Sequence, residues 1–234
     1  MSEEKVLLIT GAGSGIGKAT AKLFAGQRRL VLAGRRVEPL EELAAELGGP
    51  DRALAVSCDV GEWDQVEAMT ASALDGFGRI DEVFVNAGFG ATRGFLEESP
   101  EHWKSMVLTN VLGAALTIRS TLPHLLERSS GHYLVTSSIA GRRVLPGSMY
   151  SATKFAATAI GEALRQELRG KDDGNRIKVT LIEPGMVDTD FFENRPGDAA
   201  LSDDDIARAI KFAVEQPDGV DLNEILIRPI TQAT

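Results

Sequence analysis

Short apolar runs, separated by polar segments that contain glycine, recur along the whole chain. Each run is rich in Val, Ile or Leu and is three to six residues long, which is typical of strands buried on both faces of a parallel sheet. The pattern predicts strands at residues 6–9, 30–33, 53–58, 82–85, 133–136, 179–182 and 225–227. Segments with helical character lie between them, at residues 18–25, 38–47, 62–77, 99–127, from 150 onward and 202–215.

This alternation of single strands and helices predicts a doubly wound α/β fold, with about seven parallel strands and helices on both faces of the sheet. No internal repeat or linker interrupts it, so we expect a single domain over residues 1–234. Ser99 and Pro100 form a typical start for the helix at 99–127, which is either continuous or broken once. Asn110 lies within that helix among apolar and small residues, where it must bridge structural elements or order a water molecule.

A glycine-rich segment, Thr10-Gly11-Ala12-Gly13-Ser14-Gly15-Ile16-Gly17, joins the first strand to the first helix. In Rossmann dinucleotide-binding folds, glycines at this point allow a tight turn and let backbone N–H groups approach a pyrophosphate. A flexible connection is the alternative, but the position between a strand and a helix favours a dinucleotide site. The predicted cofactor contacts in this segment are Gly11, Ser14, Gly15, Ile16 and Gly17.

The second strand is followed by two arginines, in the sequence Gly34-Arg35-Arg36. A Rossmann fold that binds NAD usually has an acidic residue here for the ribose 2′-hydroxyl, whereas arginine suits the 2′-phosphate of NADP. Arg35 and Arg36 therefore favour NADP(H) over NAD(H). The alternative is an exposed turn that is basic without function.

Polar or glycine-containing segments also follow four other strands. The carboxyl ends of parallel strands share one edge of the sheet, where open α/β folds bind their ligands. The segments are Asp59-Val60, Asn86-Ala87-Gly88, Ser137-Ser138 and Pro184-Gly185, with Val187 and Thr189 shortly after the last.

Tyr150 and Lys154 stand four residues apart, so on a helix their side chains share one face. A phenol has an ordinary pKa of about 10, and a nearby ammonium lowers that pKa toward the range of a useful general acid or base. Read alone, the pair is more often a coincidence on a helix with a solvated lysine. The other segments decide which interpretation holds.

Composition narrows the classes of partner. The formal net charge of -9 argues against nucleic acid or an anionic membrane as a generic partner. No apolar run approaches the length of a membrane span, and the first residues are too polar for a signal peptide. Cys58 is the single cysteine, and the three histidines share no metal-ligand spacing. We expect a cytoplasmic protein without a structural metal.

Taken in order, these segments resemble the motifs of the short-chain dehydrogenase/reductase family, from about residue 5 to the C-terminus. Thr10–Gly17 resembles T-G-x-x-x-G-x-G, Asn86–Gly88 resembles N-A-G, and Tyr150-x-x-x-Lys154 is similar to the catalytic pair of the family. Asn110 matches its catalytic asparagine, and Pro184-Gly185 its P-G segment near the nicotinamide. Each motif is weak alone, but the five follow one another at suitable intervals.

The resemblance implies a role for each residue. Tyr150 would exchange a proton with the substrate oxygen during hydride transfer, and Lys154 would hold the nicotinamide ribose and lower the pKa of the phenol. Ser138 would hydrogen-bond the substrate oxygen, and Asn110 would position a water molecule. The remaining contacts would be to the adenine, from Asp59 and Val60, and to the carboxamide end of the cofactor, from Val187 and Thr189.

The register of the serine departs from the family pattern. Ser137 lies thirteen residues before Tyr150, which is the common spacing, whereas Ser138 lies twelve before it. Neighbouring strand residues point to opposite faces, so only one can face the tyrosine. Ser138 with Gly141 reproduces the S-x-x-G of the family, and a deletion of one residue in the 142–149 loop then explains the spacing. We therefore predict that Ser138 is the catalytic serine.

The substrate is predicted only as a class. A short lid is expected near residues 189–201, where Phe191 and Phe192 either cover a small apolar pocket, with neighbours Phe89, Leu145 and Met149, or pack as ordinary core. Arg142 and Arg143 either meet a substrate carboxylate or belong to a solvated loop. The ending at residues 223–232 is similar to that of NADP-dependent 3-hydroxy-acid and allo-threonine dehydrogenases. A small alcohol or hydroxy acid, or its carbonyl counterpart, is therefore favoured.

Two other functions use a similar fold. An NADP(H)-binding sensor would be expected to lose part of the Asn, Ser, Tyr and Lys set, which is complete here. A sugar-nucleotide epimerase would need a G-x-x-G-x-x-G pattern and a larger C-terminal region. Small residues gather on the helix after Tyr150 and at 113–115, and the family commonly pairs these helices between subunits. We therefore expect an oxidoreductase that forms a homodimer or homotetramer.

Overall fold

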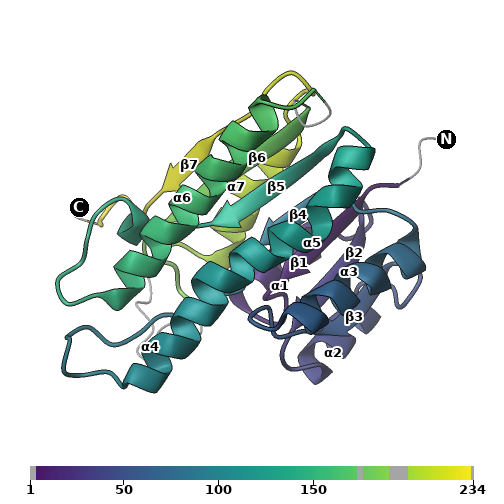
Figure 1. Cartoon of the computed structure of the whole chain (residues 1–234). Coiled ribbons are helices and arrows are strands. Elements are labelled where there is room, and N and C mark those ends of the chain that lie inside the picture. The colour runs from purple at the N-terminus through teal and green to yellow at the C-terminus, as the bar shows by residue number, and fades with distance from the viewer. Residues whose placement is uncertain (1–3, 173–175, 190–199, 233–234) are drawn as a thin grey trace.

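The computed structural model describes residues 4–172, 176–189 and 200–232. Its centre is one seven-stranded sheet in which all neighbouring strands run parallel (Figure 1). The spatial order is β3-β2-β1-β4-β5-β6-β7, which confirms the predicted doubly wound Rossmann fold. The strands are β1 (Val6–Thr10), β2 (Arg29–Gly34), β3 (Ala53–Ser57), β4 (Glu82–Val85), β5 (Gly131–Thr136), β6 (Ile177–Pro184) and β7 (Glu224–Ile227).

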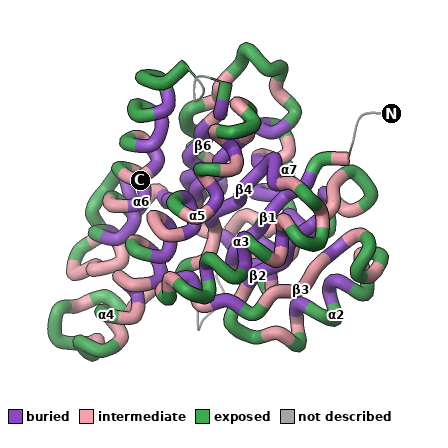
Figure 2. Tube along the Cα trace, turned by 45° about the vertical axis from the view of Figure 1, so that its right-hand side comes forward, coloured by how far each residue is buried: buried purple, intermediate pink, exposed green. Residues whose placement is uncertain are grey.

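Helices cover both faces of this sheet. One face carries α1 (Gly15–Phe24), α2 (Glu38–Glu46) and α7 (Asp203–Val214). The other face carries α3 (Trp63–Phe77), α5 (Gly113–Glu127) and α6 (Met149–Arg169). The core therefore has two apolar layers, one on each side of the sheet, and the exposed residues of the helices lie on their outer sides (Figure 2).

Strand β1 shows how the sequence builds both layers at once. All five of its residues are buried, and successive side chains point to opposite faces. Leu8 packs in the layer under α3 and α5, whereas Leu7 and Ile9 pack in the layer under α1 and α7. Because both faces are buried, the strand has a continuous apolar run instead of an alternating pattern.

The predicted helix at 99–127 is broken once. It consists of α4 (Pro100–Val107), a π-helical turn η1 (Leu108–Leu112) and α5. The predicted N-cap is confirmed, since the Ser99 hydroxyl accepts a hydrogen bond from the backbone N–H of His102 at 3.1 Å. π-helical turns are rare in proteins, and those that occur often lie at functional sites. This one contains Asn110.

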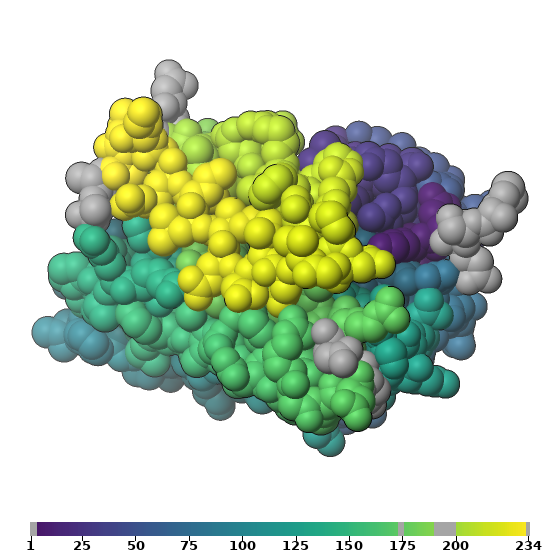
Figure 3. All heavy atoms as spheres, turned by 90° about the horizontal axis from the view of Figure 1, so that it is seen from above, coloured from purple at the N-terminus to yellow at the C-terminus, as the bar shows by residue number. Residues whose placement is uncertain are grey.

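The strand order places the ligand crevice. Strand β1 has β2 on one side and β4 on the other. The strand order therefore reverses direction between β1 and β4, which is where open α/β sheets bind ligands. The loops after β1, β2, β4, β5 and β6 all lie at the carboxyl edge. At the far end of the sheet, β7 and the residues after it form a strip of surface between α7 and α6 (Figure 3). No helix among the described residues is long and apolar enough to span a membrane.

Candidate active site

The glycine-rich segment forms a tight turn between β1 and α1. Gly11 and Gly15 have φ values of 69° and 49°, which L-residues with a side chain rarely adopt. A Cβ at Gly17 would lie 2.3 Å from the Gly11 carbonyl oxygen, so α1 approaches the turn as closely as its backbone allows. The turn thus leaves the first N–H groups of α1 pointing toward the crevice, as a pyrophosphate requires.

Asn86 joins the ends of three strands. Its Nδ2 donates to the Thr10 carbonyl oxygen at 3.1 Å, and its Oδ1 accepts from Thr136 Oγ1 at 3.1 Å. Thr10 Oγ1 in turn accepts from the backbone N–H groups of Asn86 and Ala87, at 3.0 and 3.1 Å. Asn86 and Ala87 therefore hold the β4 loop against β1. The bridging roles of the two threonines were not predicted, although Thr10 opens the glycine-rich motif and each threonine is the last residue of its strand.

Arg35 and Arg36 are exposed immediately after β2. The Arg35 guanidinium lies 5.9 Å from the centre of the Phe89 ring, in the loop after β4. Neither arginine forms an ion pair with any described residue. Two cations without an acidic partner at this place fit a phosphate-bearing ligand.

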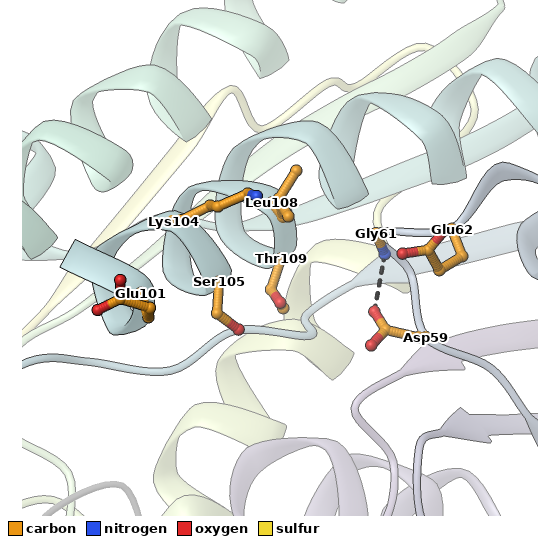
Figure 4. A pocket seen from close by; sticks show the side chains of 8 residues that line it. All are labelled: Asp59, Gly61, Glu62, Glu101, Lys104, Ser105, Leu108 and Thr109. Carbon is orange, nitrogen blue, oxygen red and sulfur yellow. Dashed lines mark hydrogen bonds between the residues drawn. The ribbon is translucent and has the colours of Figure 1, made fainter. Parts of the chain in front are cut away.

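Asp59 borders an open hollow of about 240 Å³ between the loop after β3 and the helical turns of α4 and η1 (Figure 4). One Asp59 carboxylate oxygen accepts a hydrogen bond from the Gly61 N–H at 2.9 Å, which fixes its orientation. Val60 is buried and packs against Gly113. The residues that line the hollow are Asp59, Gly61, Glu62, Glu101, Lys104, Ser105, Leu108 and Thr109.

Tyr150 and Lys154 lie on the first turns of α6, on the side that faces the sheet. The Ser148 hydroxyl caps this helix by accepting from the Ser151 N–H at 3.1 Å. Lys154 is buried, and its Nζ donates to the Thr136 carbonyl oxygen at 2.9 Å. The same Nζ lies 5.6 Å from the centre of the Tyr150 ring. The predicted pair therefore meets at the carboxyl end of β5.

Burial governs the pKa values of both side chains. It raises the pKa of the Tyr150 phenol above its ordinary value, and a hydrogen bond with Ser138 acts in the opposite direction. It lowers the pKa of the Lys154 ammonium to about 8. The pKa of the phenol is therefore raised overall and not lowered as expected from Lys154, because removal of the phenolate from water is the larger effect.

The two neighbouring serines face different sides. Ser138 is hydrogen-bonded to Tyr150, and its Oγ also lies 3.3 Å from the Pro184 carbonyl oxygen. Ser137 instead binds α6, where its Oγ donates to the Lys154 carbonyl oxygen at 3.0 Å and lies 2.7 Å from Thr158 Oγ1. The structure thus brings Ser138, and not Ser137, to the tyrosine.

Asn110 bridges the π-helical turn to two other segments. Its Oδ1 accepts from the Phe89 N–H at 3.0 Å, and its Nδ2 donates to the Phe89 carbonyl oxygen at 2.8 Å and to Thr153 Oγ1 at 3.1 Å. Gly88 lies beside this contact, since a Cβ there would be 3.0 Å from the Asn110 Oδ1 and 3.7 Å from the Lys154 Nζ. Asn110 therefore has the bridging role that the sequence left open, close to Lys154.

The segment after β6 lies across the crevice from the glycine turn. A Cβ at Gly15 would lie 3.3 Å from the Thr189 side chain, so the two segments are in contact. Gly185 donates its N–H to the Ile227 carbonyl oxygen at 2.7 Å, and Val187 is buried. Pro184 is the carbonyl partner of Ser138. The four residues predicted as cofactor contacts thus lie at or just after the carboxyl end of β6, and Thr189 among them reaches the glycine turn.

Some expectations for the substrate region are corrected or lie outside the described residues. Arg142 lies in an exposed loop, as one alternative expected, but its guanidinium is not a free cation, because it forms ion pairs with Glu183 and Glu224. Arg143 is exposed. Phe191 and Phe192 lie outside the described residues, as does most of the predicted lid. Of their expected neighbours, Phe89 holds Asn110, Leu145 donates its N–H to Ser151 Oγ at 3.1 Å, and Met149 begins α6.

Comparison with known proteins agrees with this geometry. The sequence model of the short chain dehydrogenase family matches residues 5–200. An uncharacterised oxidoreductase of Staphylococcus saprophyticus is 36% identical over 245 residues, which covers 99% of this chain and 98% of that protein.

Two solved structures are similar over nearly the whole chain. A serine dehydrogenase complexed with NADP+ has a TM-score of 0.91 and 31% identity, covering 98% of this chain and 96% of that one. A 3-ketoacyl-(acyl-carrier-protein) reductase from Brucella melitensis, complexed with NADH, has a TM-score of 0.87 and 31% identity, covering 96% and 97%. With a family match across most of its length, this chain belongs to the short-chain dehydrogenases and is an oxidoreductase of that family.

Proposed function

We propose that the protein transfers a hydride between NADP(H) and a small alcohol or hydroxy acid, or the carbonyl counterpart of either. The observation that carries this proposal is the cluster at the carboxyl end of β5, where Tyr150 is hydrogen-bonded to Ser138 and lies over the buried Lys154. A phenol, a hydroxyl and an ammonium are thereby held together beside the glycine turn. Such a set suits proton transfer to or from a substrate oxygen.

Each side chain of this cluster has a task that follows from its surroundings. The Tyr150 phenol stays protonated near neutral pH, so in the direction of carbonyl reduction it can donate its proton to the substrate oxygen. The Ser138 hydroxyl lies beside the phenol and can stabilise negative charge as it develops on that oxygen. Lys154 places a positive charge near the resulting phenolate and favours its formation. Asn110 holds the β4 loop to α6, and its second lone pair on Oδ1 can accept from a water molecule.

The cofactor is assigned from the residues that line the crevice. The glycine turn and the N-terminus of α1 suit a pyrophosphate, and the segments after β3 and β6 would border the two ends of the molecule. Bound there, a nicotinamide supplies or accepts the hydride. Arg35 and Arg36 would take the 2′-phosphate, which supports NADP(H) over NAD(H). The similar structures include complexes with both cofactors, so this preference is part of the proposal.

The substrate class rests on the end of the chain and on one relative. Residues 223–232 are similar to the ending of 3-hydroxy-acid dehydrogenases, and the similar serine dehydrogenase acts, by its name, on a small hydroxylated amino acid. A small substrate with a hydroxyl group is the chemistry common to both. The alternative of a cofactor-binding sensor has less support, because a sensor needs no acid–base group and all four positions are filled.

Absorbance of the nicotinamide cofactor tests this proposal. The purified protein is incubated with NADPH or NADH and a panel of small aldehydes, ketones and keto acids, and in the reverse direction with alcohols and 3-hydroxy acids. We expect turnover with at least one member of the panel and a higher kcat/KM with the 2′-phosphorylated cofactor. Tight NADP(H) binding without turnover on any member would favour the sensor instead.

A further inference from the structure

We infer that Arg142 is a positioning residue for Ser138, holding the turn that carries this serine against the end of β6. The inference rests on the proposed function, since it assigns Arg142 a role through the hydroxyl that faces the substrate oxygen. Nothing in the chemistry requires Arg142 to touch substrate. Its effect would come from where it holds the backbone of the turn.

One short turn after β5 is hydrogen-bonded to β6 at both of its ends. The turn η2 (Ile139–Gly141) begins after Ser138 and ends before Arg142. At its start, Ser138 Oγ lies 3.3 Å from the Pro184 carbonyl oxygen. At its end, Arg142 Nε donates to Glu183 Oε1 at 2.7 Å. Two consecutive residues at the end of β6 therefore hold the two ends of the turn.

The contact between Arg142 and Glu183 is a largely buried ion pair. Glu183 is 1% exposed, so its carboxylate is shielded from water and depends on Arg142 for compensation. The other edge of the guanidinium binds Glu224 on β7. Burial and Glu224 raise the pKa of Glu183, whereas Arg142 lowers it. Arg142 is therefore the cation that keeps the carboxylate of Glu183 charged and in place.

The neighbouring Arg143 supplies a control. It is also exposed and basic, and it forms no ion pair within the described part of the chain. If a positive charge near the site entrance were what mattered, the two arginines would be interchangeable. The structure separates them, because only Arg142 reaches β6 and β7.

Steady-state kinetics in two backgrounds test the inference. The double variant Arg142→Ala/Glu183→Gln removes the ion pair without leaving a buried charge unpaired, so it is expected to fold. We expect its kcat to fall about 10- to 100-fold, as for a misplaced active-site group, while the KM for NADPH stays unchanged. The single variant Arg142→Lys keeps a cation beside Glu183, so its kcat should fall less than that of the double variant. Arg143→Ala should have the kcat of the wild type.

The deciding comparison repeats the double variant in a Ser138→Ala background. If Arg142 acts through Ser138, its loss should have no further effect on kcat once the hydroxyl is gone. An equal fold decrease in kcat in the wild-type and Ser138→Ala backgrounds, or no decrease in the wild-type background, overturns the inference. A wild-type protein inactive on the whole panel contradicts the proposed function instead. A crystal structure of the double variant then decides the inference separately: loss of the contact between Ser138 and Pro184 supports it, and an unchanged contact overturns it.

Discussion

At the scale of single residues, burial at the site makes the positive charge of Lys154 unfavourable. Lys154 has a folded-state pKa of about 8, against an ordinary value of 10.5, because it is buried. Between these values the unfolded chain binds a proton that the folded protein has released. The free energy of unfolding therefore receives a contribution from Lys154 that increases as the pH rises through this window, and below pH 8 the full cost of the buried charge is present.

A comparison of the wild type with Lys154→Met measures this contribution. We expect the stability of the wild type, relative to the variant, to rise by about 1 kcal/mol between pH 8 and 9. Cys58 acts in the opposite direction at higher pH, because burial raises its pKa to about 11, but it is common to both proteins and cancels. Urea unfolding at each pH gives the two curves. A difference independent of pH would show that Lys154 has an ordinary pKa in the folded protein.

Tyr150→Phe separates proton transfer from binding. The variant keeps the ring over Lys154 and removes only the hydroxyl that is hydrogen-bonded to Ser138. We expect turnover to fall by about 10²–10⁴-fold, the usual contribution of a positioned acid–base group. Fluorescence titration should show NADPH binding close to that of the wild type. Turnover near the wild-type rate would rule out the proposed role of the phenol.

The two serines should differ in what they affect. Ser138→Ala removes the hydroxyl beside the phenol, and we expect kcat to fall by about 10²–10³-fold. Ser137→Ala removes contacts with Lys154 and Thr158 inside the protein, so we expect a loss of about 1 kcal/mol in the free energy of unfolding with a much smaller change in kcat. The reverse pattern would assign catalysis to Ser137.

At the scale of elements, the loop after β2 is expected to decide cofactor preference. Arg35 and Arg36 are exposed there without an acidic partner among the described residues. We expect Arg35→Ala/Arg36→Ala to raise the KM for NADPH while leaving the KM for NADH nearly unchanged, because only the former has a 2′-phosphate. An equal rise in the KM for NADPH and for NADH would show that the arginines do not recognise the 2′-phosphate. Arg143→Ala provides a control for the loss of surface charge.

The elements themselves were largely predictable from the sequence, because buried parallel strands leave short apolar runs that local pattern reveals. Contacts between distant segments were not predictable. Asn110 gains its bridging role from Phe89 and Thr153, and the Ser138 hydroxyl gains a partner in the carbonyl oxygen of Pro184, the last residue of β6. For the serines, strand alternation indicates that only one faces the tyrosine, and the S-x-x-G spacing favours Ser138, which the structure places against Tyr150.

The same reason explains the correction at Arg142. Its partners, Glu183 and Glu224, lie 41 or more residues away along the chain, so nothing near the arginine in the sequence indicates an ion pair. The register of β6 against β7 brings Glu183 opposite Leu226, close to the start of β7 where Glu224 lies. An arginine that resembles a substrate contact in the sequence thereby binds two carboxylates of its own chain.

At the scale of the whole molecule, α6 leaves one apolar stripe uncovered. Ala152, Phe155, Ala159 and Ala163 are exposed and follow one another at helical spacing. Phe155 is 41% exposed and lies in line with the three alanines. Small side chains at the other three positions would let a second helix approach closely. The stripe therefore supports the expectation that subunits pair through this helix.

Light scattering at micromolar concentration checks this expectation and its location together. We expect the wild type to form a dimer or tetramer. Ala159→Glu places a charge in the middle of the stripe, where burial against a partner would cost several kcal/mol, so it should shift the protein toward the monomer. Ala71→Glu, at an exposed alanine on α3, is the matched control and should leave the assembly intact. A monomeric wild type would contradict pairing altogether, and an oligomer that tolerates Ala159→Glu would place the interface on another surface of the protein.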